Sequence, residues 1–402
     1  MSNYKVIGVM SGTSLDGLDL AYCEFSERDG RWSFEIKQAE TIPYSTEWKE
    51  RLQSATGLSG LELSLLSTDY GHYTGKCIKE FIHKHNLQPD FAAVHGHTVF
   101  HQPTRGLTLQ IGNGAAVAAE SGLMTVCDFR TTDVALGGQG APLVPIGDRL
   151  LFSKYDYCLN LGGIANISYE APIPAKVSKE ISKNSYMQGM CNFTIPELSY
   201  DNEDIGKLCK TQQMAVFRGF HRTAFDICPC NMPLNYLANL AGIDFDKDGE
   251  LARKGSLQED LLTKLNALNY YQQAPPKSLG VEWFEKYFKP LLKTEYSTND
   301  LLKTVCEHIA IQISQVIDQT IDSVPQKSLL ITGGGALNTY LIERITAHTK
   351  AIVTQASKEL INYKEALIFA FLGVLRVQQK PNALASVTGA AKDNCGGAIY
   401  LP

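Results

Sequence analysis

Two stretches of the sequence share one design, in which two apolar runs are joined by a short turn that contains glycines. The first stretch covers residues 6–25 and the second covers residues 157–168. Apolar runs around a glycine turn predict a β-hairpin, because glycine reaches the positive φ values that tight turns require. One such hairpin lies near the start of each half, so the strand-turn-strand design is duplicated.

The turn of the first hairpin is rich in hydroxyl and carboxylate side chains. Its backbone N–H groups, together with the hydroxyls of Ser11, Thr13 and Ser14, can converge on an anion such as phosphate. Asp16 and Asp19 would repel a phosphate unless a cation lay between them, so the same turn predicts Mg²⁺ with Asp16 as a ligand. Taken alone, the stretch also fits an ordinary polar hairpin loop.

Two further glycine turns favour the phosphate interpretation. Gly162 and Gly163 form the turn of the second hairpin, which would face the first hairpin across a cleft. A third apolar run, at residues 328–332, leads into three glycines and then into a predicted helix. Backbone without side chains lets a flat ring approach closely, and the N–H groups at a helix start suit an anion or a polar ring edge.

The length and composition indicate a protein that has more than one domain and acts on small molecules. A chain of 402 residues is too long for one compact core, so we expect two domains, one of which could be inserted in the other. Hydrophobic residues make up 44% and charged residues 20%, as in globular proteins. The net charge of -5 argues against nucleic-acid and anionic-membrane partners, because both favour a basic face.

The sequence predicts a cytoplasmic location. Its first residues run straight into an apolar strand pattern without the features of a secretory signal, and no apolar segment approaches the roughly 20 residues that cross a bilayer. The 10 cysteines show no paired zinc-type spacing, so we expect small buried side chains or exposed thiols. The sequence does not fix the oligomeric state, and a homodimer is left open.

Three histidines, His95, His97 and His101, follow a short apolar run. A zinc site is one interpretation, but a glycine and a proline in the same stretch disfavour a helix that would present the rings together. We therefore favour a strand end that contributes polar groups to a cleft.

Three other polar regions are candidates for a site. Residues 128–143 are too polar and too rich in glycine to be buried, which predicts a loop across the domain junction that lines a binding site, with a plain connector as the alternative. Asp226 ends a short apolar strand, where a carboxylate facing a cleft is as well supported as a helix N-cap or turn residue. Glu365 lies on an otherwise apolar helix, and solvent exposure is its simplest explanation.

The remaining pattern combines strands and helices. Alternation predicts an antiparallel strand over residues 31–40. Residues 170–222 interrupt the pattern with a stretch rich in proline, serine, lysine and asparagine, which predicts an exposed and mobile excursion. The spacing of apolar residues predicts helices within residues 46–86, 232–240, 257–271, 298–322 and 358–378.

The chain resembles the anhydro-N-acetylmuramic acid kinases, a family with the actin, Hsp70 and hexokinase ATPase fold. The resemblance covers nearly the whole chain outside residues 170–222. Its most specific motifs are Met10-Ser11-Gly12-Thr13-Ser14-Leu15-Asp16-Gly17, Gly137-Gly138-Gln139-Gly140-Ala141-Pro142-Leu143-Val144-Pro145, Asn160-Leu161-Gly162-Gly163-Ile164-Ala165-Asn166 and Pro276-Lys277-Ser278-Leu279-Gly280.

The resemblance implies an α/β fold of two RNase H-like domains, each a mixed five-stranded sheet with flanking helices, and ATP in the cleft between them. We assign residues 1–130 and 360–402 to the first lobe and residues 131–359 to the second. The implied roles are phosphate binding by the two hairpins and adenosine binding by the triple-glycine segment. The residues so assigned to ATP are Gly12, Thr13, Ser14, Leu15, Asp16, Gly17, Leu18, Asp19, Gly162, Gly163, Gly333, Gly334, Gly335 and Asn338.

The reaction implied by the resemblance couples ring hydrolysis to phosphorylation and belongs to amino-sugar catabolism in peptidoglycan recycling. Water attacks the anomeric carbon of 1,6-anhydro-N-acetylmuramic acid, and O6 takes the γ-phosphoryl group of ATP to give N-acetylmuramic acid 6-phosphate. Asp226 matches the family's catalytic aspartate, and a carboxylate base that activates water resembles inverting glycoside hydrolysis. Phosphorus captures the departing oxygen, with Mg²⁺ and N–H groups carrying the charge. His95, Arg130 and Glu365 match positions in the sugar pocket.

The chain departs from the family pattern next to Asp226. Where the family has Phe-Asp-Thr-Gly-Pro-Gly-Asn, residues 225–231 read Phe-Asp-Ile-Cys-Pro-Cys-Asn, so two glycines and their access to positive φ are lost. The family's His-Gly-Gln is His-Gly-His at residues 95–97. Two alternatives therefore remain open, which are a non-catalytic ATP-binding sensor or assembly module and a kinase for another sugar that opens no ring.

Overall fold

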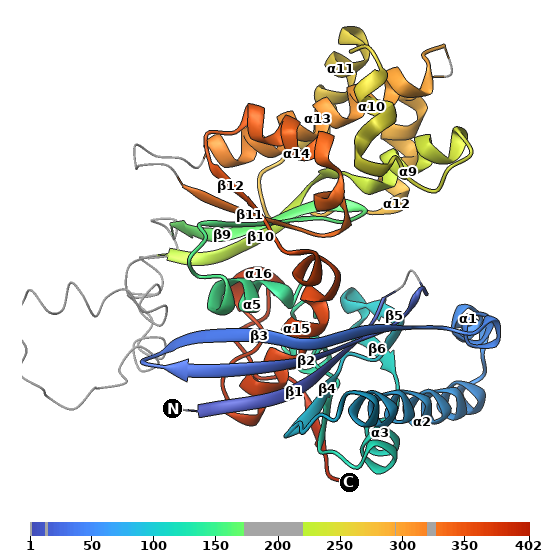
Figure 1. The fold of residues 1–402 in the computed structure, drawn as a ribbon, viewed down its shortest axis with the longest axis vertical. Coiled ribbons are helices and arrows are strands. Elements are labelled where there is room, and N and C mark those ends of the chain that lie inside the picture. The colour runs from blue at the N-terminus through green and yellow to red at the C-terminus, as the bar shows by residue number, and fades with distance from the viewer. Residues whose placement is uncertain (1, 13–14, 173–219, 294, 320–326) are drawn as a thin grey trace, which may run out of the picture. The chain divides into compact units, whose positions relative to one another are not determined.

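The computed structural model describes residues 2–12, 15–172, 220–293, 295–319 and 327–402 (Figure 1). The chain forms two compact units. Unit 1 comprises Met1–Ser153, Glu170–Arg222 and Glu365–Pro402, and unit 2 comprises Lys154–Tyr169 and Thr223–Lys364. Residues 131–153, which the sequence analysis assigned to the second lobe, cluster with unit 1.

The sheet of unit 1 is mixed and has the strand order β13-β7-β4-β1-β2-β3. The antiparallel hairpin of β1 and β2 continues into β3, while β4 and β7 add in parallel on the other side of β1. β13 closes this edge by antiparallel pairing with β7. The strands are β1 (Ser2–Ser11), β2 (Gly17–Arg28), β3 (Arg31–Pro43), β4 (Phe91–Val94), β7 (Thr125–Cys127) and β13 (Ala398–Tyr400), and β5 (His97–Gln102) and β6 (Leu107–Ile111) form a separate antiparallel pair.

The sheet of unit 2 repeats this plan with the strand order β10-β9-β8-β11-β12. A central strand, β8, again pairs antiparallel with the next strand of the chain and parallel with a later one. The predicted fold of two related domains with mixed sheets is confirmed, although β13 gives the first sheet a sixth strand. The strands are β8 (Tyr157–Leu161), β9 (Ile164–Pro172), β10 (Phe220–Pro229), β11 (Ser328–Thr332) and β12 (Ile352–Gln355).

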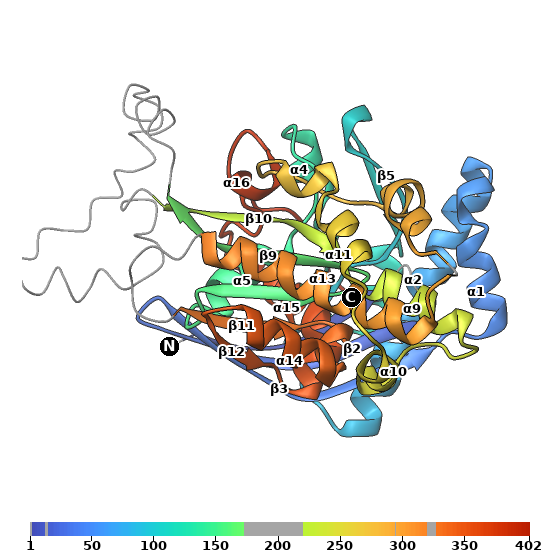
Figure 2. The ribbon, with the colours of Figure 1, turned by 90° about the horizontal axis from the view of Figure 1, so that it is seen from above.

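Helices cover both faces of the sheet of unit 1 (Figures 1 and 2). Successive side chains of a strand point to opposite faces, and Ile7 and Val9 of β1 join a core cluster with residues of α2 (Gly60–His85). On the opposite face, Gly8 lets the backbone of α15 (Lys358–Val377) approach closely, since an added β-carbon would collide with the carbonyl oxygen of Ala366. The other helices of unit 1 are α1 (Thr46–Gln53), α3 (Gly114–Ser121), α4 (Thr131–Ala135), α5 (Val144–Leu151) and α16 (Ala385–Thr388).

The helices of unit 2 enclose a second core. α13 (Thr298–Gln319) is the most deeply buried of them, and its side chains pack with those of β8 and β11. The other helices are α9 (Asn231–Leu240), α10 (Glu250–Lys254), α11 (Glu259–Asn266), α12 (Val281–Trp283) and α14 (Thr339–His348). Short 3₁₀ turns cover Ala55–Gly57, Pro103–Arg105, Lys247–Gly249, Asn269–Gln272, Lys289–Leu291 and Gly334–Leu337, and Phe284–Phe288 is a π-helical turn.

Most predicted elements agree with the structure in type and differ in extent. The helix predicted over residues 257–271 breaks into α11 and a 3₁₀ turn. The prediction that residues 128–143 form a loop too polar to be buried was wrong, because this stretch contains α4 and buries Phe129 and Asp133. The excursion predicted at residues 170–222 is shorter at both ends, because β9 runs to Pro172 and β10 starts at Phe220; residues 173–219 lie outside the described residues. No helix among the described parts is long and apolar enough to cross a membrane.

Candidate functional site

The first hairpin turn forms between β1 and β2, where Met10 pairs with Asp19 and Ser11 with Leu18. The N–H of Leu15 donates to the carbonyl of Gly12 over 3.4 Å, and Leu15 has a positive φ of 57°. Thr13 and Ser14 lie outside the described residues. The predicted hairpin is therefore present, and its ligand remains a prediction.

The side chains next to this turn divide into buried and accessible ones. Ser11 was expected to face an anion, but this residue is 2% exposed, and its hydroxyl lies 2.8 Å from the hydroxyl of Tyr44 and 3.2 Å from Nδ1 of His97. The side chain of Leu18 belongs to the core of unit 1, so only its backbone could meet a ligand. Gly17 is also buried. It lies so close to β3 that an added β-carbon would be 2.5 Å from the carbonyl oxygen of Ile42.

The two carboxylates of the turn suit a cation. Asp16 is exposed, and Asp19 is partly buried and accepts a hydrogen bond of 2.6 Å from the hydroxyl of Thr41. Burial raises the pKa of Asp19, the bond from Thr41 lowers it, and repulsion from Asp16 raises it further. Mg²⁺ is commonly held by one or two carboxylates together with phosphate oxygens and water, which is what this pair could provide. The described residues contain no cluster of three or more histidine, cysteine or acidic side chains that could hold a metal.

The second hairpin turn is tied to the start of α9. The carbonyl of Gly163 accepts hydrogen bonds from the N–H groups of Cys230 (2.8 Å) and Met232 (3.1 Å), and the carbonyl of Gly162 accepts one from Asn231 (3.0 Å). Nδ2 of Asn231 also donates to the carbonyl of Leu161 over 3.0 Å. These bonds fix the glycine turn on the end of a helix.

The triple-glycine segment packs against the same turn. An added β-carbon at Gly333, whose φ is 80°, would lie 2.5 Å from Oδ1 of Asn160, and one at Gly335 would lie 2.8 Å from Oδ1 of Asn231. Around Gly334 there is more room, since the nearest such atom, Nδ2 of Asn231, is 3.7 Å away. Asn338 caps α14, because its Oδ1 accepts the N–H of Leu341 over 3.0 Å. Unit 2 thus brings together Gly162, Gly163 and Gly333–Asn338, and their binding of a nucleotide stays a prediction.

Asp226 lies in β10 with a half-buried side chain, which excludes the helix N-cap interpretation. Its Oδ2 accepts the N–H of Leu279 over 2.9 Å. Burial raises the pKa of this carboxyl, and the hydrogen bond from Leu279 lowers it. A carboxylate with a raised pKa and one oxygen held in place is suited to accept a proton.

The altered sequence after Asp226 is accommodated without a positive φ at either cysteine. Cys228 and Cys230 stand where the family has glycines, and both side chains are fully buried in the core of unit 2. The φ of Cys230 is −124°, and Cys228 is not among the residues with positive φ. Neither position therefore uses the positive φ that favours glycine, and Asp226 lies in β10.

The three residues predicted to bind sugar lie in unit 1 and interact with one another. Nε of Arg130 donates to Nε2 of His95 over 3.0 Å, and Nη1 of Arg130 donates to the carbonyl of Gly140 over 2.7 Å. Burial lowers the pKa of Arg130 to about 10, while the nearby carboxylate of Glu365 raises it. Glu365 is exposed on α15. The structure brings these side chains together, and their contact with sugar remains a prediction.

Comparison with known proteins decides the family. The family described as "Anhydro-N-acetylmuramic acid kinase" matches residues 4–192 and 213–402. The chain belongs to this family. Similar proteins include the "Anhydro-N-acetylmuramic acid kinase" of Vibrio parahaemolyticus serotype O3:K6, 32% identical over 99% of this chain and 98% of the relative, and that of Pasteurella multocida, 33% identical over 98% and 96%. The predicted membership of an ATP-dependent sugar kinase family is confirmed.

A solved structure with a similar chain path is the "(R)-2-hydroxyglutaryl-CoA dehydratase component A" of Acidaminococcus fermentans. It has 11% sequence identity and a TM-score of 0.41, with 91% of this chain and 96% of that chain covered.

Sequence reasoning about the anhydro-N-acetylmuramic acid kinase motifs missed two sets of residues. The hydroxyl of Tyr270 donates to the carbonyl of Asp226 over 2.7 Å, and the carbonyl of Lys277 accepts the N–H of Asp226 over 3.2 Å. Asp133, which is fully buried, accepts the N–H of Gly140 over 2.8 Å and so supports the carbonyl that holds Arg130. The Pro276–Gly280 motif was the signal for the first set, and the polar loop at 128–143 was the signal for the second.

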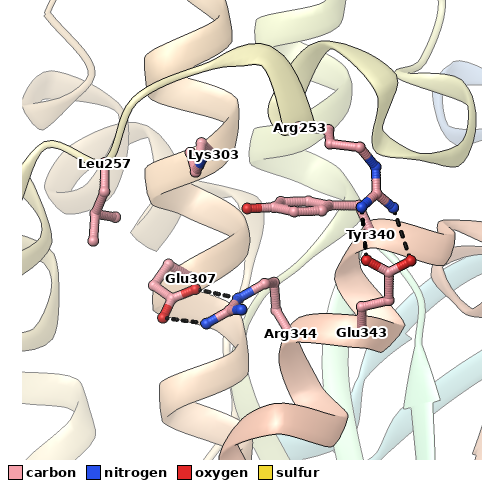
Figure 3. Close-up of a pocket in the computed structure, with 7 residues that line it drawn as sticks. All are labelled: Arg253, Leu257, Lys303, Glu307, Tyr340, Glu343 and Arg344. Atoms are coloured by element: carbon pink, nitrogen blue, oxygen red, sulfur yellow. Dashed lines mark hydrogen bonds and ion pairs between the residues drawn. The ribbon is translucent and has the colours of Figure 1, made fainter.

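A pocket of about 410 Å³ lies in unit 2 among α10, α13 and α14 (Figure 3). Each charged side chain that lines it already has a partner. Arg253 forms two hydrogen bonds with Glu343, and Arg344 forms two with Glu307. Nζ of Lys303 donates to the carbonyl of Gly255. The family motifs assign no residue to this pocket. Its lining residues are Arg253, Leu257, Lys303, Glu307, Tyr340, Glu343 and Arg344.

Proposed function

We propose that the chain catalyses the reaction that its family membership implies, the ATP-dependent conversion of 1,6-anhydro-N-acetylmuramic acid to N-acetylmuramic acid 6-phosphate. Water adds to C1, the bond between C1 and O6 breaks, and O6 forms a bond to the γ-phosphorus as ADP leaves. The observation that carries the proposal is Asp226, a half-buried carboxylate with a raised pKa, in a chain that matches the family over nearly its whole length.

Asp226 takes the proton from the attacking water. A base held in a partly buried environment has a pKa closer to neutrality than an exposed carboxylate, which favours proton transfer in the transition state. Its Oδ2 is already bonded to the N–H of Leu279, so Oδ1 is the oxygen that would meet the water. A separate acid is not required, because phosphorus captures the departing O6.

His95, Arg130 and Glu365 bind the sugar. The guanidinium of Arg130 is held by His95 and by the carbonyl of Gly140, which presents a charge in a fixed orientation to an acidic or hydroxyl group of the substrate. Fixed orientation lowers the entropy cost of reaching a reactive geometry.

The glycine turns bind ATP. The hairpin at Gly12–Asp19 and the turn at Gly162 and Gly163 take the phosphates, and the segment from Gly333 to Asn338 takes the adenosine. Asp16, with Asp19 beside it, would hold Mg²⁺, which shields phosphate charge during phosphoryl transfer. We also place the protein in the cytoplasm, where ATP is supplied.

The decisive experiment incubates the folded protein with ATP, Mg²⁺ and the anhydro sugar and follows the 6-phosphate by mass spectrometry. We expect product from the wild type and a loss of about 10²-fold or more in Asp226→Asn, because the amide cannot take up the proton. Transfer to an ordinary hexose or amino sugar that is insensitive to Asp226→Asn would identify a kinase without ring opening. ATP binding without turnover of any sugar would identify a sensor.

A further inference from the structure

The environment of Asp226 is built by a segment that is distant in sequence. Residues 277–279 run beside β10, where the carbonyl of Lys277 accepts the N–H of Asp226 over 3.2 Å and the N–H of Leu279 donates to Oδ2 over 2.9 Å. Among the described residues no hydrogen bond engages Oδ1 of Asp226. The same short segment therefore fixes the backbone of this residue and the orientation of its carboxylate.

Tyr270 contacts both Asp226 in β10 and Lys277 in the segment beside it. Its hydroxyl donates to the carbonyl of Asp226 over 2.7 Å, and its ring lies 4.6 Å from Nζ of Lys277. Nζ of Lys277 also donates to the carbonyl of Tyr270 over 3.3 Å. Tyr270 is 4% exposed, so its ring is fixed by packing. An ammonium over a partly desolvated aromatic face is attracted by the ring quadrupole, which adds to the hydrogen bonds.

We propose that Tyr270 and Lys277 are positioning residues that hold the carboxylate of Asp226 for proton transfer. This inference rests on the proposed function of Asp226 as the base. The hydroxyl of Tyr270 donates to the backbone carbonyl of Asp226, and the ammonium of Lys277 contacts the ring and the carbonyl of Tyr270. Two residues after Lys277, the N–H of Leu279 donates to Oδ2 of Asp226. Among the described residues, neither side chain forms a hydrogen bond with the carboxylate of Asp226 itself.

The hydrogen bond from Leu279 stabilises the charged form of the carboxylate against the cost of its burial. If the hydrogen bond from the hydroxyl of Tyr270 to the carbonyl of Asp226 is lost, residues 277–279 shift relative to β10 and the bond from Leu279 weakens. The pKa of Asp226 then rises further, and the carboxylate loses its fixed orientation. Both effects reduce turnover, whereas the binding of ATP and of sugar depends on other residues.

The test compares Tyr270→Phe with the matched variant Tyr271→Phe. The hydroxyl of Tyr271 lies 2.9 Å from Nε2 of the fully buried His308, so this neighbouring variant removes a buried hydrogen bond of unit 2 that does not involve Asp226. We expect Tyr270→Phe to lower kcat by about tenfold or more with unchanged KM for both substrates, and to move the acid limb of kcat/KM upward by roughly half a pH unit to one unit. Tyr271→Phe should lower thermal stability and leave kcat and the acid limb unchanged.

Lys277 provides a second pair of variants. Lys277→Arg keeps a cation over the ring of Tyr270 and should retain most of the turnover. Lys277→Met keeps a long apolar chain without the charge and should resemble Tyr270→Phe. Wild-type kcat and an unmoved acid limb in both Tyr270→Phe and Lys277→Met would overturn the proposal.

A direct titration separates this inference from the proposed function. The carboxyl carbon of Asp226 is followed by NMR in protein with ¹³C-labelled aspartate, and Asp226→Asn assigns the resonance. Even if the wild type turned over no anhydro sugar, which would reject the proposed function, the pKa of Asp226 should be higher in Tyr270→Phe than in the wild type or in Tyr271→Phe. An equal pKa in all three proteins would reject the positioning role.

Discussion

Arg130 donates a hydrogen bond from Nε to Nε2 of His95 over 3.0 Å, so the imidazole of His95 must be neutral and carry its proton on Nδ1. Nδ1 in turn lies 2.8 Å from the carbonyl oxygen of Gly96, to which it donates. Burial, with the positive charge of Arg130, lowers the pKa of His95 to about 3. The two side chains thus form one unit whose geometry depends on a histidine that stays uncharged.

This neutral histidine predicts a pH dependence of stability. In the unfolded chain the pKa of His95 returns to its ordinary value of 6.5, so between 6.5 and about 3 the unfolded state binds a proton that the native state does not. The contribution of neutral His95 to the free energy of unfolding is fully present above pH 6.5 and is lost as the pH falls. The loss reaches roughly 2 kcal/mol at about pH 5. Urea unfolding of both proteins at about pH 7 and about pH 5 should show that the free energy of unfolding falls less in His95→Gln than in the wild type. An equal fall in both proteins would contradict the neutral assignment.

Arg130→Lys should weaken sugar binding selectively. A lysine has one ammonium and cannot reproduce the donations from Nε to His95 and from Nη1 to Gly140, so its charge loses its fixed orientation. We expect the KM for the sugar to rise by about tenfold or more while the KM for ATP is unchanged. Arg105→Lys is the control, since Arg105 is exposed and among the described residues hydrogen-bonds the side chain of Gln102 alone. A rise in KM for ATP of the same size would place Arg130 outside the sugar pocket.

Asp133→Asn should destabilise unit 1. The fully buried carboxylate of Asp133 accepts bonds from the N–H of Gly140, the hydroxyl of Thr388 and Nδ2 of Asn394, each within 2.8 Å. In Asp133→Asn the NH₂ group would replace one acceptor oxygen and face at least one of these three donors. We expect this to cost roughly 3 kcal/mol in the free energy of unfolding. Urea unfolding measures this loss, and Asp128→Asn, at an exposed position, is the control that should have little effect.

Gly163→Ala tests the second hairpin as a phosphate site. An added β-carbon at Gly163 meets no protein atom within 4 Å, so the variant should unfold at the same temperature as the wild type. If phosphate approaches this turn, the methyl group should raise the KM for ATP without affecting that for the sugar. Gly335→Ala is the contrasting variant, because its β-carbon would lie 2.8 Å from Asn231 and should cost stability as well. Unchanged KM values in a stable Gly163→Ala protein would count against the assignment.

Much of the fold could be predicted from the sequence, because strands, helices and glycine turns depend on local patterns. The two hairpins, the strand before the triple glycine and the long helices occur where periodicity indicated them. The sixth strand β13 was missed, since a three-residue strand carries too little pattern to detect. The hydroxyl of Ser11 was assigned to an anion from its neighbours in sequence, but Tyr44 reaches it from a distant segment.

The sequence by itself determined the family, the duplicated hairpins and the identity of the candidate base, because these depend on residue type and on spacing along the chain. Only the tertiary structure decided what surrounds each of these groups. Tyr270 and Lys277 reach Asp226 from more than 40 positions along the chain, and Asp133 accepts from Thr388 across 255 positions. Burial and hydrogen bonding set the charge and orientation of a carboxylate, and both arise only when distant segments pack together.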